Sequence, residues 1–319
     1  MTVSEGLERR LVLGVDGGNS KTDALLLDGS GRVVASVRGP TVSHQAVGMG
    51  AGMARLQALV AELRSAARVE LSVIPAVGVL ALAGADYPSD ERRLRAAIAP
   101  LGLAERVDVI NDTWAGLRAG TDRGWGIVLI CGAGTNAAGL APDGRRWRFP
   151  AVGTIAGDWG GGGDIGMDGL RAAVRAWDGR GPATSLRQRI PEAAGLRRIE
   201  ALVRVLYEGR TSLRVRSFAP IVFRAAMDGD LVARGIIDHQ ADELAAMAGA
   251  IAKRVRLTRS DPDVVLAGAV FETDDAAFFA RLEAGVRRAI PRARLVRCSR
   301  SPAHGAALLA LDSLAEQPR

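Results

Sequence analysis

The stretch GVDGGNSKTDALLLDGSGR, residues 14–32, decides how this chain folds. The apolar segment LVLGVD (11–16) is typical of a strand, and it runs into a loop rich in glycine that also carries lysine and threonine. DALLLD (23–28) is a second apolar strand, Asp28-Gly29 is a turn signal, and RVVASV (32–37) is β-branched and apolar. The segment is therefore predicted to form a three-stranded meander with a glycine loop at its first turn.

The glycine loop has the composition of a phosphate-binding loop, but two common types do not fit it. A Walker A loop needs glycine directly before the lysine and a helix afterwards, whereas Ser20 precedes Lys21 and a strand follows. The Rossmann loop should also open a helix. Backbone N–H groups at a hairpin tip can still bind phosphate, with Ser20 and Thr22 adding hydroxyls and Lys21 adding charge. Asp16 is placed to hold hydrated Mg²⁺. The alternative, for this loop taken alone, is an ordinary glycine-rich hairpin.

An internal repeat supports the ligand-binding interpretation. The segment CGAGTNAAGLAPDG (131–144) aligns without a gap with DGGNSKTDALLLDG (16–29), at an offset of 115 residues. The matched residues are Gly17 and Gly132, Ser20 and Thr135, and Asp28-Gly29 and Asp143-Gly144. Because each copy follows an apolar strand and opens a meander, the repeat indicates a duplicated α/β domain.

Apolar periodicity predicts the other elements. A helix is expected over 48–67, with one apolar face made by Met53, Leu56, Leu59, Val60 and Leu63. Ser89 is expected to N-cap a helix that ends near Ala99. Strands are expected at 75–83, 106–110, 125–131, 264–270 and 293–298, and helices at 111–118, 231–257, 274–290 and 302–314. The chain is expected to be mainly helical from Asp164 onward.

Composition excludes several classes of protein. The net charge is +7, but the basic residues are spread along the chain and aromatic residues make up 4%, which argues against nucleic-acid binding. Cys131 and Cys298 are far apart and the histidines are isolated, which argues against a disulfide framework, a zinc site and a redox pair. We find no apolar run of about 20 residues and no signal core, so a cytoplasmic protein that does not bind membranes is expected.

Several motifs, in order, resemble those of the actin/hexokinase/Hsp70 superfamily. GVDGGNSKT (14–22) and LICGAGTN (129–136) resemble its two phosphate motifs, and VVLAGAVFE (264–272) resembles its adenosine motif. Within it, the chain is most similar to the N-acetylglucosamine kinase and BadF-type ATPase family. That similarity extends to INDTWAG (110–116), GDWGGGGDIG (157–166), SFAPIVFRAAMDGD (217–230) and SPAHGAALLAL (301–311).

The resemblance implies an α/β fold of duplicated RNase H-like domains around a central nucleotide cleft. The domains are expected at 1–118 and 119–319, with the last helix packing back on the first domain. The implied protein is a homodimeric kinase that uses ATP and Mg²⁺ and phosphorylates the 6-hydroxyl of N-acetylglucosamine or glucosamine.

The family's catalytic base matches Asp112. A carboxylate at the end of a buried strand and the start of a helix could accept the proton of a sugar hydroxyl. The alternative is that Asp112 caps its helix, since Asn111, Asp112 and Thr113 are all good capping residues.

The resemblance also implies the ligand contacts. Phosphate and adenosine contacts are expected at Gly17, Gly18, Asn19, Ser20, Lys21, Thr22, Gly132, Ala133, Gly134, Thr135, Ala219 and Gly268, with Asp16 holding the metal. Sugar contacts are expected at Ser43, His44, Ala83, Gly84, Asp112, Thr135, Asn136, Gly153 and Asp158. Without the resemblance, the run from Gly160 to Gly163 would be taken as a flexible loop.

Three residues depart from the family pattern, and they put the identity of the sugar in doubt. Ser43 stands where asparagine is common, and Ala83 where serine is common. Trp159 replaces a glutamate, and is either a platform on which a sugar stacks or a packing residue.

Three other functions share parts of this sequence pattern. ATPase activators of acyl-CoA dehydratases and reductases share the phosphate loops but hold an iron–sulfur cluster with cysteines, and neither Cys131 nor Cys298 has a cluster-like neighbourhood. A sugar-responsive repressor would need a helix-turn-helix module, for which we find no room. A non-catalytic protein that binds ATP or sugar stays open, because Ser43 and Ala83 could mark a lost sugar site.

Overall fold

The computed structural model describes residues 10–70, 73–210 and 213–316. The chain forms two compact units. Unit 1 comprises Met1–Trp125 and Cys298–Arg319, and unit 2 comprises Gly126–Arg297. In this division residues 119–125 and the C-terminal segment group with the first unit.

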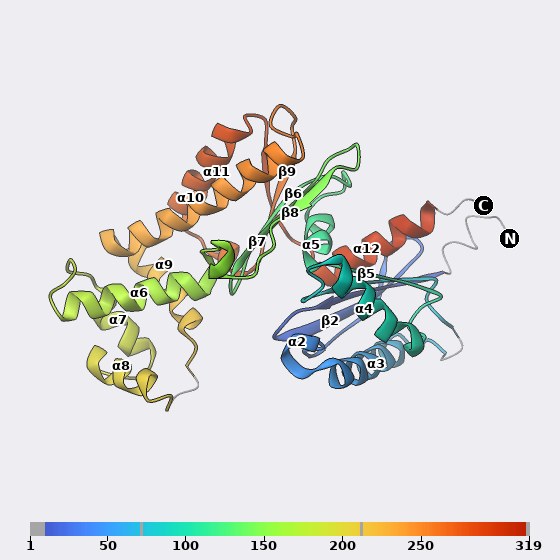
Figure 1. Cartoon of the computed structure of the whole chain (residues 1–319), viewed down its shortest axis with the longest axis horizontal. Helices are drawn as coiled ribbons and strands as arrows, with labels where there is room; N and C mark the ends of the chain where they lie inside the picture. The colour runs from blue at the N-terminus through green and yellow to red at the C-terminus, as the bar shows by residue number, and fades with distance from the viewer. Residues whose placement is uncertain (1–9, 71–72, 211–212, 317–319) are drawn as a thin grey trace. The chain divides into compact units, whose positions relative to one another are not determined.

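Unit 1 contains a five-stranded sheet in the order β3-β2-β1-β4-β5. Its strands are β1 (Leu11–Gly17), β2 (Lys21–Asp28), β3 (Val33–Pro40), β4 (Val77–Leu82) and β5 (Arg106–Ile110). Figure 1 labels the strands β2 and β5 of this sheet. The first three strands are antiparallel neighbours, and β4 and β5 extend the sheet in parallel from β1. The predicted meander is therefore confirmed.

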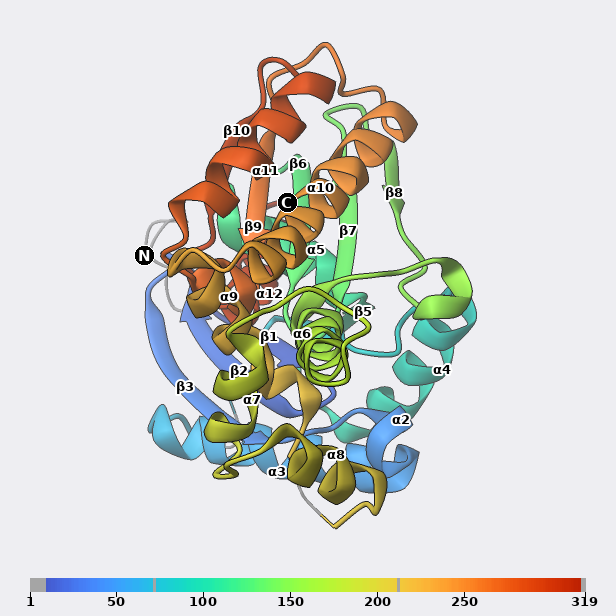
Figure 2. The same ribbon diagram turned by 90° about the vertical axis from the view of Figure 1, so that its left-hand side faces the viewer.

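Unit 2 repeats this strand order. Its sheet runs β8-β7-β6-β9-β10, so β6, β7 and β8 form the meander and β9 and β10 the parallel extension. Its strands are β6 (Gly126–Cys131), β7 (Thr135–Leu140), β8 (Arg146–Arg148), β9 (Asp263–Ala267) and β10 (Arg294–Arg297). In Figure 2 the helices α10 (Leu231–Arg254) and α11 (Ala276–Ala289) lie in front of these strands. The predicted duplication is confirmed.

The gapless register of the repeat is wrong, however. The second turn of each meander is closed by the same bonds, from Asp28 N–H to Arg32 O and from Ala141 N–H to Arg145 O. Gly31 and Gly144 occupy the same place in these turns, with φ of 84° and 83°. The turns therefore lie 113 residues apart (144 minus 31) rather than 115, so Asp143 corresponds to Ser30 and not to Asp28.

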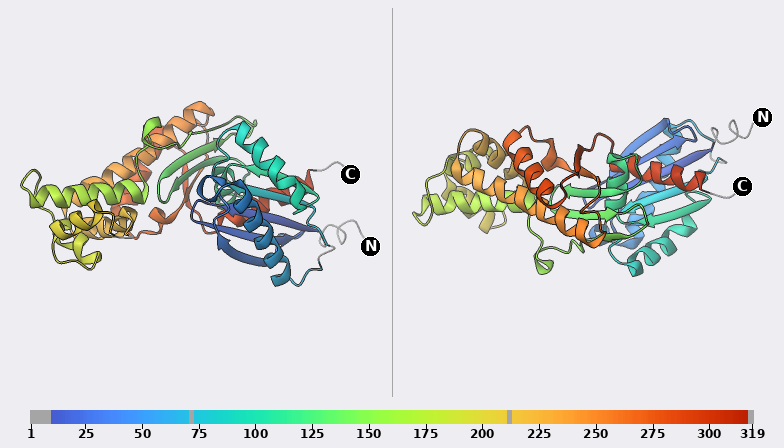
Figure 3. Two further views of the ribbon diagram at one scale, coloured as in Figure 1. Left: turned by 60° about the horizontal axis from the view of Figure 1, so that its bottom comes forward. Right: turned by 90° about the horizontal axis from the view of Figure 1, so that it is seen from above.

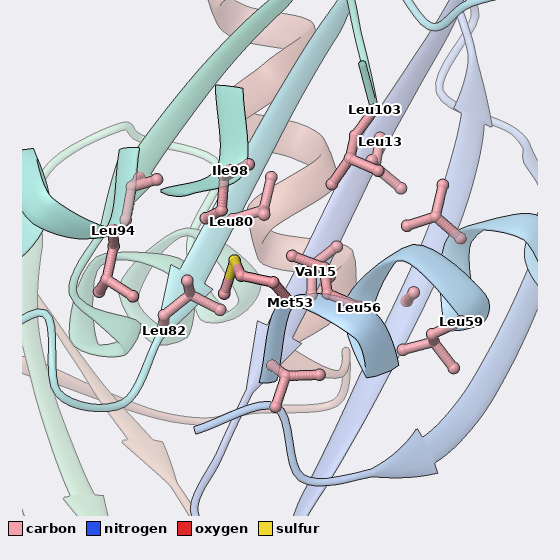
Figure 4. Packing of buried hydrophobic residues seen from close by; sticks show 14 of the residues in the cluster. Leu13, Val15, Met53, Leu56, Leu59, Leu80, Leu82, Leu94, Ile98 and Leu103 are labelled. Carbon is pink, nitrogen blue, oxygen red and sulfur yellow. The ribbon is translucent and has the colours of Figure 1, made fainter. Parts of the chain in front are cut away.

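Alternation along β1 divides the core of unit 1 between the two faces of its sheet. Leu13 and Val15 point into a cluster with α3 (Met49–Ala66) and α4 (Pro88–Ile98), as Figure 4 shows. The predicted apolar face of α3 is confirmed, since all five of its residues are buried. Ser89 is not the N-cap of α4, because Pro88 already occupies the first turn and Tyr87 precedes it.

The opposite face of the sheet is covered by α12 (Pro302–Ala315) and α5 (Asp112–Gly120). A Cβ on Gly14 would lie 2.3 Å from the carbonyl oxygen of Ala303, and one on Gly305 would lie 2.0 Å from that of Ala115. Glycine at these two positions lets α12 approach β1 and α5 closely.

Unit 2 carries a helical insertion between β8 and β9. Helix α6 (Gly161–Trp177) is packed by α7 (Leu186–Ala193), α8 (Ile199–Tyr207) and α9 (Ala219–Met227), as Figure 3 shows. It begins at Gly161, before the expected start near Asp164. Among the described residues, no helix has both the length and the apolar character needed to cross a bilayer.

Candidate functional site

The first loop, residues 17–22, is the tip of the β1–β2 hairpin. Gly18 N–H donates to Lys21 O at 3.0 Å and closes the tip. Asn19, Ser20 and Lys21 are exposed there, where a ligand could reach them. Gly17 is required for packing, because a Cβ would lie 2.5 Å from the Leu82 side chain.

Side chains brace this loop from the interior. The Thr41 hydroxyl donates to Gly18 O at 2.7 Å, and the fully buried Thr22 hydroxyl accepts from Val42 N–H at 3.0 Å. Ser43 donates to Asn19 Oδ1 at 2.7 Å. Thr22, Thr41 and Ser43 therefore hold the first loop in shape.

Asp16 is the penultimate residue of β1, beside the first loop and directly opposite Asp23 of β2. Burial, followed by the charges of Asp112 and Asp23, raises the pKa of the Asp16 carboxyl to about 7, against a small opposing effect of Lys21. Burial acts in the same direction on Asp23, but bonds from Arg38 and Lys21 outweigh it and lower the pKa of that carboxyl. Asp16 is thus a partly neutral carboxyl in a locally negative environment.

Asp112 is the first residue of α5, directly after β5 and Asn111. The cap of α5 is Asn111, whose Oδ1 accepts from Thr113 N–H at 3.2 Å and from the Thr113 hydroxyl at 2.7 Å. Asn111 Nδ2 donates to Ala85 O and Asp86 Oδ1, which ties α5 to the turn after β4. The helix therefore does not need Asp112 as its cap.

The expected sugar residues of unit 1 gather at the end of β4. The main-chain N–H of Ala83 donates to Gly17 O at 2.8 Å. Gly84, with φ of 81°, packs against His44, whose Cε1 would lie 2.8 Å from a Cβ on the glycine. The buried Nδ1 of His44 has no hydrogen-bond partner among the described residues. Ser43, His44, Ala83 and Gly84 thus lie along one edge of unit 1, beside the first loop.

The second loop, residues 132–135, is the tip of the β6–β7 hairpin in unit 2. Gly132 N–H donates to Gly134 O at 2.9 Å, closing a tip similar to that of the first loop. A Cβ on Gly132 or Gly134 would meet nothing within 4 Å. Packing therefore does not demand glycine here, and both positions leave open space for a ligand to approach the backbone.

Helix α6 fixes the orientation of the second loop. Gly162 N–H donates to Gly132 O and Gly163 N–H to Ala133 O, each at 2.8 Å. Both peptides are trans, so the N–H groups of Ala133 and Gly134, on the opposite edges of the same peptide planes, point away from α6. Outward N–H groups of this kind form an anion-binding nest.

The run Gly160–Gly163 is thus not a flexible loop, and its glycines have a packing reason. A Cβ on Gly161 would lie 2.5 Å from Gly134 Cα, and one on Gly163 would lie 3.0 Å from Ala133 O. Sequence reasoning missed this role, although four consecutive glycines after a strand and loop were a usable signal for close backbone contact.

The adenosine-motif residues lie next to the second loop. Gly268 has φ of 108°, and a Cβ there would lie 2.5 Å from Cys131 O. Ala219, the first residue of α9, places its Cβ 3.7 Å from where a Cβ on Gly162 would be. Unit 2 therefore brings Gly132, Gly162, Ala219 and Gly268 together from four separate segments.

The expected sugar residues of unit 2 lie at the start of β7 and in the segment that follows β8. Asp158 Oδ2 accepts from Gly153 N–H at 2.8 Å, which closes a small loop. Asn136 Oδ1 accepts from Ala137 N–H at 2.8 Å, and the Thr135 hydroxyl donates to Trp159 O at 3.3 Å. The Trp159 ring packs on His239, with centroids 4.1 Å apart, so Trp159 acts at least as a packing residue.

The described part of the chain shows neither a metal cluster nor an ionised thiol at Cys131. It contains no group of three or more His, Cys, Asp and Glu side chains arranged to hold a metal ion. Burial raises the pKa of the Cys131 thiol to about 12, which keeps it protonated at neutral pH.

Comparison with known proteins identifies the family. Residues 13–310 match the sequence profile of the BadF/BadG/BcrA/BcrD ATPase family. The chain belongs to this family. The BadF-type resemblance of the motifs is thereby confirmed.

Two relatives of this BadF-family chain match it over nearly its whole length. The N-acetyl-D-glucosamine kinase of Dictyostelium discoideum is 26% identical over 318 residues, covering 96% of this chain and 99% of the relative. The N-acetylmuramic acid/N-acetylglucosamine kinase of Clostridium acetobutylicum is 28% identical over 308 residues, covering 94% and 98%.

Solved structures confirm the fold class. A candidate N-acetylglucosamine kinase from Chromobacterium violaceum superimposes with a TM-score of 0.74 at 21% identity, covering 95% of this chain and 99% of that one. A ROK-family glucokinase from Streptomyces griseus, solved with glucose and AMPPNP, gives a TM-score of 0.56 at 18% identity, with the same coverage. The BadF-family chain therefore has the duplicated α/β fold of these actin-like kinases.

Proposed function

We propose that this protein is an ATP-dependent kinase that transfers the γ-phosphoryl group to the 6-hydroxyl of N-acetylglucosamine or glucosamine. The observation that carries the proposal is the second loop, where α6 turns two N–H groups outward and two glycines leave space beside them. Phosphoryl transfer depends on positioning of this kind. The names of the two full-length relatives support the choice of sugar.

Asp112 is the proposed general base. A sugar hydroxyl has a pKa far above 7, so transfer needs a carboxylate to accept its proton as the bond to phosphorus forms. Asn111 caps α5, so the capping alternative does not account for Asp112. Ser43, His44, Ala83, Gly84, Asn136, Gly153 and Asp158 are the proposed sugar contacts.

Asp16 fits the proposed magnesium ion. Its carboxyl is desolvated and lies in the field of Asp112 and Asp23, so a divalent cation would offset the negative charge that raises its pKa. Mg²⁺ commonly binds through one or two carboxylates, with water and phosphate oxygens as the other ligands, and so needs no larger side-chain cluster. When bound, Mg²⁺ would neutralise charge on the phosphates.

An ATPase that activates a partner enzyme is the second candidate, because the matched family is named for ATPases. An iron–sulfur cluster held by cysteines needs accessible thiols, and the Cys131 side chain is fully buried. A non-catalytic protein that binds ATP or sugar is the third candidate. The expected homodimer and cytoplasmic location stay predictions.

ADP release measured over a panel of amino sugars and plain hexoses, with a control lacking sugar, separates these candidates. The kinase proposal expects release that depends on N-acetylglucosamine or glucosamine. Equal release with and without sugar favours the ATPase, and no release in any reaction favours the non-catalytic protein.

A further inference from the structure

Gln240 of α10 is a fully buried polar residue beside the second loop. Its Oε1 accepts a hydrogen bond of 2.6 Å from Gly161 N–H, the first main-chain N–H of α6. Its Nε2 is also buried and has no hydrogen-bond partner among the described residues. One end of this amide is therefore used and the other is not.

The unpaired Nε2 of Gln240 makes a buried glutamine costly at this position. Leaving a buried donor without an acceptor costs about 1–3 kcal/mol, which a methionine or leucine of similar size would avoid. The amide cannot be reversed, because the –NH₂ group would then face another donor at Gly161. The bond accepted by Oε1 is thus what a glutamine supplies here and an apolar side chain could not.

The bond from Gly161 N–H to Gln240 Oε1 fixes the first turn of α6, and this turn orients the second loop. Gly161, Gly162 and Gly163 donate in succession to Gln240, to Gly132 O and to Ala133 O. An N-terminal N–H of a helix has no acceptor within the helix, so a side chain must supply one where water cannot reach. Gln240 therefore anchors the start of α6, and the next two donors hold the loop.

The neighbouring segment is fixed from the same side. His239, adjacent to Gln240 in α10, packs on the Trp159 ring. A Cβ on Gly160 would lie 2.8 Å from both the Gln240 amide and Thr135 Cγ2, so the backbone passes tightly between α10 and β7. Residues 159–161 thus have little freedom to shift as long as Gln240 stays in place.

We propose that Gln240 is a positioning residue, which holds α6 so that the N–H groups of Ala133 and Gly134 face the phosphates of the nucleotide. This inference rests on the proposed function, in which the second loop binds those phosphates. Gln240 touches no ligand in this account. Its effect should fall on binding of the phosphates and spare binding of adenosine.

The test compares binding of AMPPNP and of adenosine by calorimetry, using the full chain. Gln240→Met removes both polar ends of the side chain at similar volume. Gln240→Asn keeps the amide but withdraws it by one methylene, and serves if the methionine variant does not fold. Gln188→Met makes the same change at an exposed residue of α7 and is the matched control.

We expect each folded Gln240 variant to bind AMPPNP about tenfold more weakly, since an intact loop is needed to aim charge-assisted bonds at phosphate. Adenosine binding should stay within about twofold, and Gln188→Met should match the wild type. Unchanged AMPPNP binding in a folded Gln240 variant, or an equal loss for both ligands, would overturn the proposal. If the wild type binds neither ligand, the proposed function is wrong and this inference falls with it.

Discussion

The two loops occupy the same place in the two units but are held in shape by different means. Hydroxyls support the first loop, where Thr41 donates to Gly18 O and Thr22 accepts from Val42 N–H. Main-chain groups support the second loop, where the glycine turn of α6 donates to Gly132 O and Ala133 O. Each loop also has one bond of the other kind, from Ala83 N–H to Gly17 O and from the Thr135 hydroxyl to Trp159 O. The duplication therefore preserved the hairpin and changed the main source of its support.

The surroundings of the loops also differ in charge. Asp16, Lys21 and Asp23 lie at or beside the first loop, and Asp112 contributes to the field at Asp16. The second loop carries no ionisable side chain except the buried thiol of Cys131 that precedes it. We infer that unit 1 supplies the charged groups of the reaction, while unit 2 supplies a fixed main-chain surface for the nucleotide.

Asp112→Asn should give the largest effect, because it removes the proposed proton acceptor from the charged unit. We expect kcat to fall by about 10²–10⁴-fold, the usual contribution of a general base. AMPPNP binding should stay within about threefold of the wild type. Asp108→Asn, at a half-exposed residue of β5, the strand that precedes α5, is the control and should leave kcat nearly unchanged. Undiminished turnover by Asp112→Asn would show that Asp112 is not the general base, and would contradict the inference that unit 1 supplies the charged groups of the reaction.

Gly161→Ala tests the main-chain support of the second loop. The new Cβ would lie 2.5 Å from Gly134 Cα at a φ of 81°. Gly157→Ala is the matched control, because its φ is 80° and a Cβ there meets nothing within 4 Å. Denaturant unfolding should show about 1–3 kcal/mol more destabilisation for Gly161→Ala, the usual cost of overpacking. Equal losses for the two variants would show that the contact with the second loop is unimportant.

Asp16→Asn tests the electrostatic cost of the first loop. Because the native pKa of about 7 lies above the ordinary value of 3.8 for an aspartate, the folded state holds the proton more tightly. Wild-type stability should therefore decrease as pH rises from 3.8 towards 7, and the full cost is present above pH 7. Without ligand, we expect Asp16→Asn to be more stable by about 4 kcal/mol above pH 7, since the rise from 3.8 to about 7 costs about 1.36 kcal/mol for each pH unit.

The stability gain of Asp16→Asn over the wild type should shrink as pH falls towards 3.8. Chemical denaturation across the pH range measures it. Activity of Asp16→Asn should be low at every pH. An equal stability difference at all pH values would contradict the assigned pKa.

Thr22→Val should give the smallest effect, since it removes one hydroxyl from the support of the first loop. The buried Val42 N–H would lose its acceptor, which costs about 1–2 kcal/mol. Thr154→Val, at an exposed residue, controls for the change of side chain and should leave the unfolding free energy nearly unchanged. If Thr22→Val is as stable as this control, hydroxyls do not hold the first loop.

The sequence predicted the helices and strands better than the contacts that hold the two loops in place. Apolar periodicity located β1, α3 and α12 to within a residue or two, because burial sets that pattern. Gln240 and the glycine turn could not be found in this way, because their partners lie far along the chain and only the fold brings them together. Residue type alone also made Asn111, Asp112 and Thr113 equally good caps. The hydrogen bond from Thr113 N–H to Asn111 Oδ1 identifies Asn111 as the cap.

The fate of the γ-phosphoryl group tests the central claim most directly. With ATP labelled on its γ-phosphorus and N-acetylglucosamine or glucosamine as acceptor, the account predicts label on the 6-hydroxyl of the sugar. ADP should form in an equal amount, and Asp112→Asn should transfer almost no label. Label recovered solely as inorganic phosphate, at the same rate with and without sugar, would contradict the account.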